Sequence, residues 1–112
     1  MGPFSATVHE LPVGGPVVVR CTGELDGEAT PGLDVTLGRI LRESAAEVTI
    51  DLRDVTFLDS EGIRSLVRMQ QRLTAATRPL EVVVRYPSAV ASVLRVSALD
   101  RVLPVRFDPP LA

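Results

Sequence analysis

An acidic serine turn stands out at residues 56–66, which read TFLDSEGIRSL. Ser60 lies between two carboxylates, Asp59 and Glu61, and Gly62 follows them. A serine hydroxyl at the start of a helix can cap that helix by accepting a backbone hydrogen bond. It can also accept a phosphoryl group, which adds about −1.5 to −2 charges at neutral pH. These residues alone leave both roles open.

The charges around Ser60 indicate what phosphorylation would achieve. A helix start has free N–H groups and the positive end of the helix dipole, and both favour an anion. The carboxylates of Asp59 and Glu61 disfavour an anion at Ser60. Those of Glu24 and Asp26 would do the same if their loop met Ser60 across the top of the sheet. We therefore expect a phosphate to act on a second protein, because an unpaired charge buried at an interface is unfavourable by several kcal/mol.

The sequence offers little for catalysis. His9 is the only histidine, and the sequence places no nucleophile in a pattern that would pair with it. Cys21 is the only cysteine and has no activating base. In its apolar run, Cys21 is expected to pack as a small hydrophobic residue. A divalent cation could use four carboxylates, Glu24, Asp26, Asp59 and Glu61. Loop carboxylates are mostly solvated, so we expect no catalytic group, metal or cofactor; turnover abolished by EDTA would contradict this.

Composition limits the class of protein. The chain has 112 residues, 46% of them hydrophobic, and a formal net charge of −2. We expect a single domain over residues 1–112, with a core at about 5–107 and a frayed tail at 108–112. The charge does not favour nucleic acid or anionic lipid. No apolar stretch reaches the length of a membrane span and no signal region is visible, so we expect a cytoplasmic protein.

Hydrophobic periodicity predicts alternating strands and helices. Gly14-Gly15 suits a hairpin between strands near 5–11 and 16–22. Further strands are expected at 47–59, 79–86 and 102–106, with a turn at 97–99. Three helices are expected between them: one with Thr30 as N-cap, Pro31 first and a stripe of Leu33, Leu37, Ile40 and Leu41; one with Ile63, Leu66, Val67 and Leu73; and one capped by Ser88, with Val90, Val93 and Leu94. The fold class is therefore α/β, with a mostly parallel central sheet, an N-terminal β-hairpin and flanking helices.

Three segments together resemble the STAS domain of bacterial anti-sigma factor antagonists: TGELDGEATPGL, VTIDLRDVTFLDSEGIRSLVRM and VRYPSAVASVLRVSALDRVLPVRF. The resemblance runs from about Val17 to Phe107. Its most specific part is the Asp-Ser-x-Gly turn after DLRDVTFL, together with the GELD motif that precedes it in the family order. The resemblance implies a single STAS-type domain and a regulator without catalytic activity.

The resemblance also implies a phosphoswitch. In the family, the serine after the aspartate is phosphorylated by an anti-sigma factor with serine-kinase activity, whose ATP would bring any magnesium. The unmodified antagonist binds that partner and releases a sigma factor, and a phosphoserine phosphatase restores the modified form. By alignment Ser60 takes the phosphoacceptor position. The implied partner-binding residues lie at two loops, Glu24, Asp26 and Gly27 in one, and Asp59, Ser60, Glu61, Gly62 and Arg64 in the other.

Two positions depart from the family pattern. Glu61 stands where the family usually has Ser or Thr, and Arg64 stands where it often has Gly. Glu61 places a permanent negative charge beside Ser60, which could weaken kinase binding or imitate the phosphorylated state. Arg64, one helical turn after Ser60, could offset that charge by an i,i+4 contact. The alternative is a non-switching STAS scaffold in a stress-signalling assembly, which would bind its partner equally well in both states.

Overall fold

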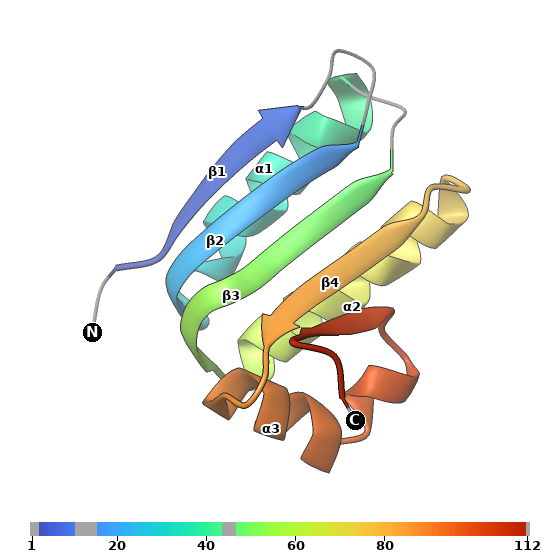
Figure 1. Ribbon diagram of the computed structural model, residues 1–112. Helices are drawn as coiled ribbons and strands as arrows, with labels where there is room; N and C mark the ends of the chain where they lie inside the picture. The colour runs from blue at the N-terminus through green and yellow to red at the C-terminus, as the bar shows by residue number, and fades with distance from the viewer. Residues whose placement is uncertain (1–2, 11–15, 44–46, 112) are drawn as a thin grey trace.

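The computed structural model describes residues 3–10, 16–43 and 47–111 (Figure 1). Strands and helices alternate in nearly the predicted order. They are β1 (Ser5–Glu10), β2 (Val17–Leu25), α1 (Thr30–Glu43), β3 (Val48–Leu58), α2 (Ser60–Ala75), β4 (Leu80–Arg85), α3 (Ala89–Val96), a 3-10 helix η1 (Leu99–Arg101) and β5 (Val105–Asp108).

The five strands form one sheet in the order β1-β2-β3-β4-β5. Strand β1 pairs antiparallel with β2, and the other three neighbouring pairs are parallel. This confirms the predicted α/β class and the mostly parallel sheet with an antiparallel N-terminal strand. The predicted turn at Gly14-Gly15 lies outside the described residues.

The last strand differs from its prediction. It was expected at 102–106, but η1 occupies the preceding stretch and β5 begins only at Val105. Asp108, expected in a frayed tail, instead pairs with Arg85 in the β4–β5 ladder. Its carboxylate also accepts a hydrogen bond from Arg53 at 2.8 Å. Ordered structure therefore continues into the segment that was expected to fray.

The core lies between the sheet and its helices. Alternation in β2 places Val17, Val19 and Cys21 in the interior, all at most 2% exposed. The predicted helix stripes contribute Leu33 and Leu66, both fully buried. Figure 1 shows α1 and α2 together behind the sheet, with α3 below its lower end. In the described parts of the chain, no helix combines the length and apolar character needed to cross a bilayer.

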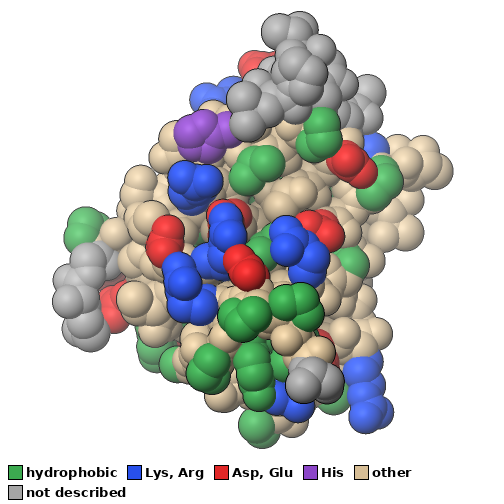
Figure 2. All heavy atoms as spheres, in the orientation of Figure 1, with side chains coloured by type: hydrophobic (Ala, Val, Ile, Leu, Met, Phe, Trp, Pro, Cys, Tyr) green, Lys and Arg blue, Asp and Glu red, His purple; other side chains and the backbone are tan. Residues whose placement is uncertain are grey.

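The side of the sheet away from α1 and α2, here called the open sheet face, carries a network of charges. Asp51 is only 5% exposed and accepts hydrogen bonds from the Arg53 guanidinium at 2.9 and 3.1 Å and from the Arg53 backbone N–H at 3.0 Å. Arg20 lies 3.7 Å from the same carboxylate. Figure 2 shows acidic and basic side chains interleaved across this face. The acidic and basic side chains on this face therefore form ion pairs with one another.

The pKa values of Asp51 on this face and of Cys21 in the core beneath it are shifted by burial and by neighbouring charges. Burial of Asp51 disfavours its charged form, but its hydrogen bonds with Arg53 and the charges of Arg53 and Arg20 outweigh it and lower the Asp51 pKa. Cys21 responds in the opposite direction, because burial first, and the charge of Asp51 second, raise its pKa to about 12. The thiol is therefore protonated at neutral pH, in keeping with the packing role expected for Cys21.

Candidate partner-binding site

Helix α2 begins with a side-chain cap supplied by Asp59. Its backbone is extended (φ −101°, ψ −176°), and its carboxylate accepts the Gly62 N–H at 2.9 Å. Ser60 is the first residue of the helix and is exposed. Capping by Ser60, one of the two roles left open by the sequence, is therefore wrong. Asp59 performs it, because only Asp59 has the non-helical backbone that a cap requires.

The two predicted loops lie against each other. The Asp59 N–H donates to the Leu25 carbonyl at 3.4 Å. A Cβ added to Gly62 would lie 2.3 Å from that same carbonyl oxygen and 2.7 Å from Leu58 Cδ1, so only glycine fits there. A Cβ on Gly27 would lie 3.5 Å from Glu61 Cγ, at ordinary contact distance. The end of β2 and the start of α2 thus form one surface.

The loop after β2 is organised by Asp26. Its carboxylate accepts the N–H groups of Glu28 and Ala29 at 3.1 and 3.0 Å, and its carbonyl accepts the Thr30 N–H at 3.1 Å. Thr30, expected to be the N-cap of α1, is the first helical residue, and its hydroxyl donates to Gly27 at 3.4 Å. That capping prediction is wrong, because the helical hydrogen bonds already begin with the Leu33 N–H donating to the Ala29 carbonyl at 3.2 Å, one residue before Thr30.

An exposed ion pair stands beside Ser60. Arg64 donates to Glu61 at 2.6 Å, with the two side chains 67% and 45% exposed. The sequence suggested that Arg64 would offset the charge of Glu61 through an i,i+4 contact, but the observed pair is i,i+3 and joins Arg64 to Glu61 itself. Farther along α2, Arg68 contacts Asp34 of α1 at 3.1 Å, and buried Ser65 donates to the same carboxylate at 3.0 Å.

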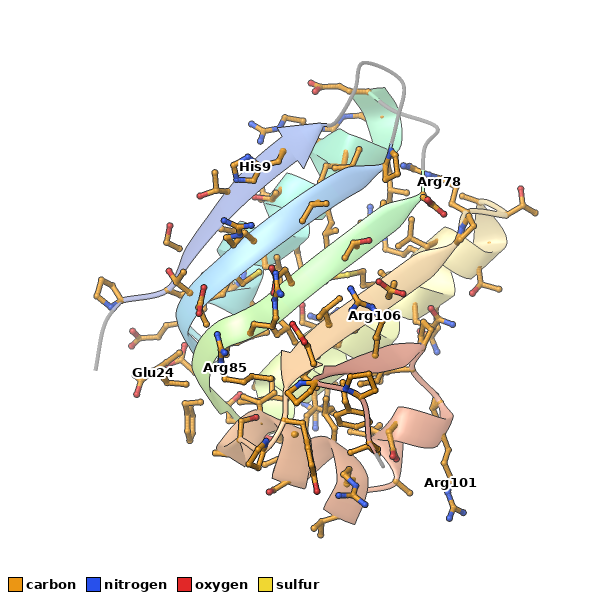
Figure 3. The ribbon with its side chains drawn as sticks, viewed as in Figure 1. His9, Glu24, Arg78, Arg85, Arg101 and Arg106 are labelled. Carbon is orange, nitrogen blue, oxygen red and sulfur yellow. The ribbon has the colours of Figure 1, made fainter. Side chains whose placement is uncertain are left out.

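A hollow of about 380 Å³ lies next to this surface. Figure 3 shows one of its acidic residues, Glu24, near the end of β2. The lining residues are Pro3, Phe4, Glu24, Asp26, Glu28, Ala29 and Gly32. Within residues 3–10, 16–43 and 47–111, no three His, Cys, Asp or Glu side chains are grouped to hold a metal ion. The four carboxylates Glu24, Asp26, Asp59 and Glu61, all within those ranges, are therefore not arranged as such a group.

Sequence reasoning missed Phe57, which it placed within a buried strand. Phe57 is 47% exposed and lies opposite Glu24 in the β2–β3 register. The register shifts between Gly23 and Glu24, so the simple alternation of inward and outward residues is lost. Gly23, with a φ of 87°, was the available signal, since a glycine inside a strand often marks a bulge. We call Glu24, Asp26, Gly27, Phe57 and residues 59–64 the Ser60 surface.

Comparison with known proteins finds a matching family and solved structures with a similar fold. The family described as Mlab, STAS domain matches residues 13–104, most of the chain. No curated protein matches it. Among solved structures, an anti-sigma factor antagonist from Mycobacterium paratuberculosis is 28% identical, with a TM-score of 0.79 over 92% of this chain and 85% of that one.

Two structures of the anti-sigma factor antagonist SpoIIAA are also similar. Its unphosphorylated form has a TM-score of 0.74 at 19% identity, covering 92% of this chain and 87% of that one. The phosphorylated form, described as the Bacillus cell fate determinant, has a TM-score of 0.67 at 18% identity, covering 92% and 90%. At these identities the likeness is one of fold. The family match over residues 13–104 shows that the chain belongs to the STAS domain family, and its fold is that of anti-sigma factor antagonists.

Proposed function

We propose that this protein is a cytoplasmic anti-sigma factor antagonist working as a single domain. In its unmodified form it binds an anti-sigma factor with serine-kinase activity and so releases a sigma factor. Phosphorylation at Ser60 ends that binding, and a phosphoserine phosphatase restores it. The protein contributes a docking surface and a phosphoacceptor, while the kinase contributes the catalysis.

The observation that carries this proposal is the exposure of Ser60 at a helix start that is already capped by Asp59. Because the cap does not use Ser60, a phosphate can be added without removing a stabilising hydrogen bond of the fold. The M. paratuberculosis protein, 28% identical, is itself an anti-sigma factor antagonist, which supports the partner class. The phosphorylated form of SpoIIAA supports the compatibility of this fold with phosphorylation.

Electrostatics explain how the modification would end binding. In the unmodified protein the Glu61–Arg64 pair is internally balanced beside Ser60. A phosphate at Ser60 would add a dianion beside a loop that already carries Glu24 and Asp26. At a docked interface the added negative charge would lose water without gaining a matching group on the second protein, which weakens binding.

The test is phosphorylation by the cognate kinase with ATP and Mg²⁺, followed by site mapping with mass spectrometry. We expect modification of Ser60, abolished in Ser60→Ala. Ser65→Ala is the matched control, because Ser65 is fully buried and should never be modified. Ser60→Asp should weaken partner binding at least about tenfold, or about 1.4 kcal/mol, while Ser60→Ala binds constitutively. Modification that persists in Ser60→Ala would contradict the site.

A non-switching scaffold is the second candidate, and Glu61 favours it, because a permanent charge beside Ser60 could imitate phosphorylation. Titration calorimetry with the partner before and after kinase treatment separates the two functions. A scaffold would bind both forms with the same affinity. A loss of binding that phosphatase treatment reverses would establish the switch.

A further inference from the structure

We propose that Arg64 is the side chain that binds the phosphate on Ser60, and that it leaves Glu61 to do so. This inference rests on the proposed function, because it concerns the phosphorylated form of Ser60. It assigns Arg64 and Glu61 the roles of cation and competing anion in one exchange.

Helix geometry places both anions within reach of one guanidinium. Arg64 follows Glu61 by three residues and Ser60 by four, and both spacings put side chains on neighbouring positions of a helix. Arg64 is 67% exposed, so its side chain is free to turn from one neighbour to the other. The exchange needs only side-chain rotation, and the backbone of α2 keeps its place.

The phosphate is the stronger anion of the two. It carries about twice the charge of a carboxylate at neutral pH and offers three acceptor oxygens to the planar guanidinium. The present pair of Arg64 with Glu61 is half exposed, and such pairs are weak. The next arginine along the helix, Arg68, is one turn farther from Ser60 and contacts Asp34. Arg64 is therefore the cation best placed to respond.

The exchange would carry the effect of the modification to the second loop. The Glu61 side chain lies beside Gly27, which follows Asp26, since a Cβ added to Gly27 would be 3.5 Å from Glu61 Cγ. Once Arg64 moves to the phosphate, the carboxylate of Glu61 remains beside that loop without its counter-charge. One phosphate would thus alter the charge of both halves of the Ser60 surface.

The experiment uses the full chain with phosphoserine genetically encoded at position 60, without kinase or partner. A ³¹P NMR titration measures the second pKa of that phosphoserine. We expect Arg64→Gln to raise this pKa by about 0.3, as expected for loss of an exposed ion pair. Arg68→Gln is the matched control and should leave it within about 0.1. An unchanged phosphoserine pKa in Arg64→Gln would overturn the proposal.

Competition by Glu61 is tested in the same titration. Removing the competitor with Glu61→Gln should enlarge the effect of Arg64→Gln, whereas equal effects in both backgrounds would contradict an exchange. The Gly27 amide resonance should shift on phosphorylation and shift less in Glu61→Gln. Amide spectra of the unmodified variants check that each is folded. Since no partner is present, failure here leaves the proposed function standing, and a partner indifferent to phosphorylation would leave this exchange intact.

Discussion

The Ser60 surface and the open sheet face use the same residue types to opposite ends. On the open sheet face, Asp51 is buried and receives three hydrogen bonds from Arg53, which also bonds Asp108. On the Ser60 surface, Arg64 and Glu61 share one contact in solvent. Burial makes the first network part of the fold, because an unpaired buried charge is strongly unfavourable. Exposure leaves the second pair weak enough to exchange partners.

The two regions also differ in what holds their backbone. Strands of the sheet secure the open face, whereas the Ser60 surface depends on the close approach of two loops at Gly62. We therefore expect changes of charge on the Ser60 surface to have little effect on stability, whereas a larger side chain at Gly62 should destabilise the fold. On the open sheet face, by contrast, we expect stability to be sensitive to the loss of charge at Asp51.

The largest expected effect comes from Gly62→Ala. The new methyl group would collide with the Leu25 carbonyl, which is backbone and cannot rotate away. We expect a loss of about 2–3 kcal/mol in the free energy of unfolding, measured by urea denaturation. Gly32→Ala is the control, because nothing lies within 4 Å of the position its Cβ would take. It should stabilise α1 by about 0.5 kcal/mol. Equal stability of the two variants would show that the loops are not tightly packed.

The next effect is expected on the open sheet face. Asp51→Asn removes the charge that pairs with Arg53 and should lower the free energy of unfolding by about 2 kcal/mol at pH 7. Asp54→Asn is the matched control, since the contact of Asp54 with Arg85 is exposed on both sides. It should change stability by less than about 0.5 kcal/mol. Comparable losses in the two variants would remove the distinction between buried and exposed pairs.

The acid limb of the stability curve follows the same network. The Asp51 pKa is lowered in the folded protein, so its contribution is fully present above the unfolded value of about 3.9. It is lost as the pH falls through the lower folded pKa. Urea titrations below about pH 4 should therefore show wild type and Asp51→Asn converging. A difference that stays constant down to pH 2 would contradict this linkage.

The smallest expected effect separates the two residues at the start of α2. Asp59→Ala removes the hydrogen bond to the Gly62 N–H and should cost about 1 kcal/mol. Ser60→Ala should change stability by less than about 0.5 kcal/mol, because Ser60 is exposed and does not cap the helix. Thermal denaturation of both variants makes the comparison. A larger loss in Ser60→Ala would restore the capping role to Ser60.

Periodic residues were enough to predict most of the fold. The stripe of Leu33 and Leu37 predicted α1, and the alternation around Val19 predicted β2, because burial of one face imposes a period on the sequence. The same reasoning brought the loops of Asp26 and Asp59 to one edge, since parallel strands end there together.

What the sequence could not predict depends on local angles and distant contacts. Asp59 and Ser60 are both good caps, and only the backbone conformation decides between them. Phe57 is exposed because a bulge shifts the phase of the strands, which periodicity does not record. Arg53 bonds Asp108 across 55 positions of the chain, beyond the reach of any local pattern.

The enclosure of Cys21 has a practical consequence for studying the Ser60 surface. The sequence contains no other cysteine, and this one is inaccessible and protonated at neutral pH, so thiol-directed dyes should leave it unlabelled. A cysteine introduced on exposed α2 could therefore carry a fluorophore at one defined position. Because the natural cysteine is buried, partner association could be followed by the fluorescence of a single label on α2.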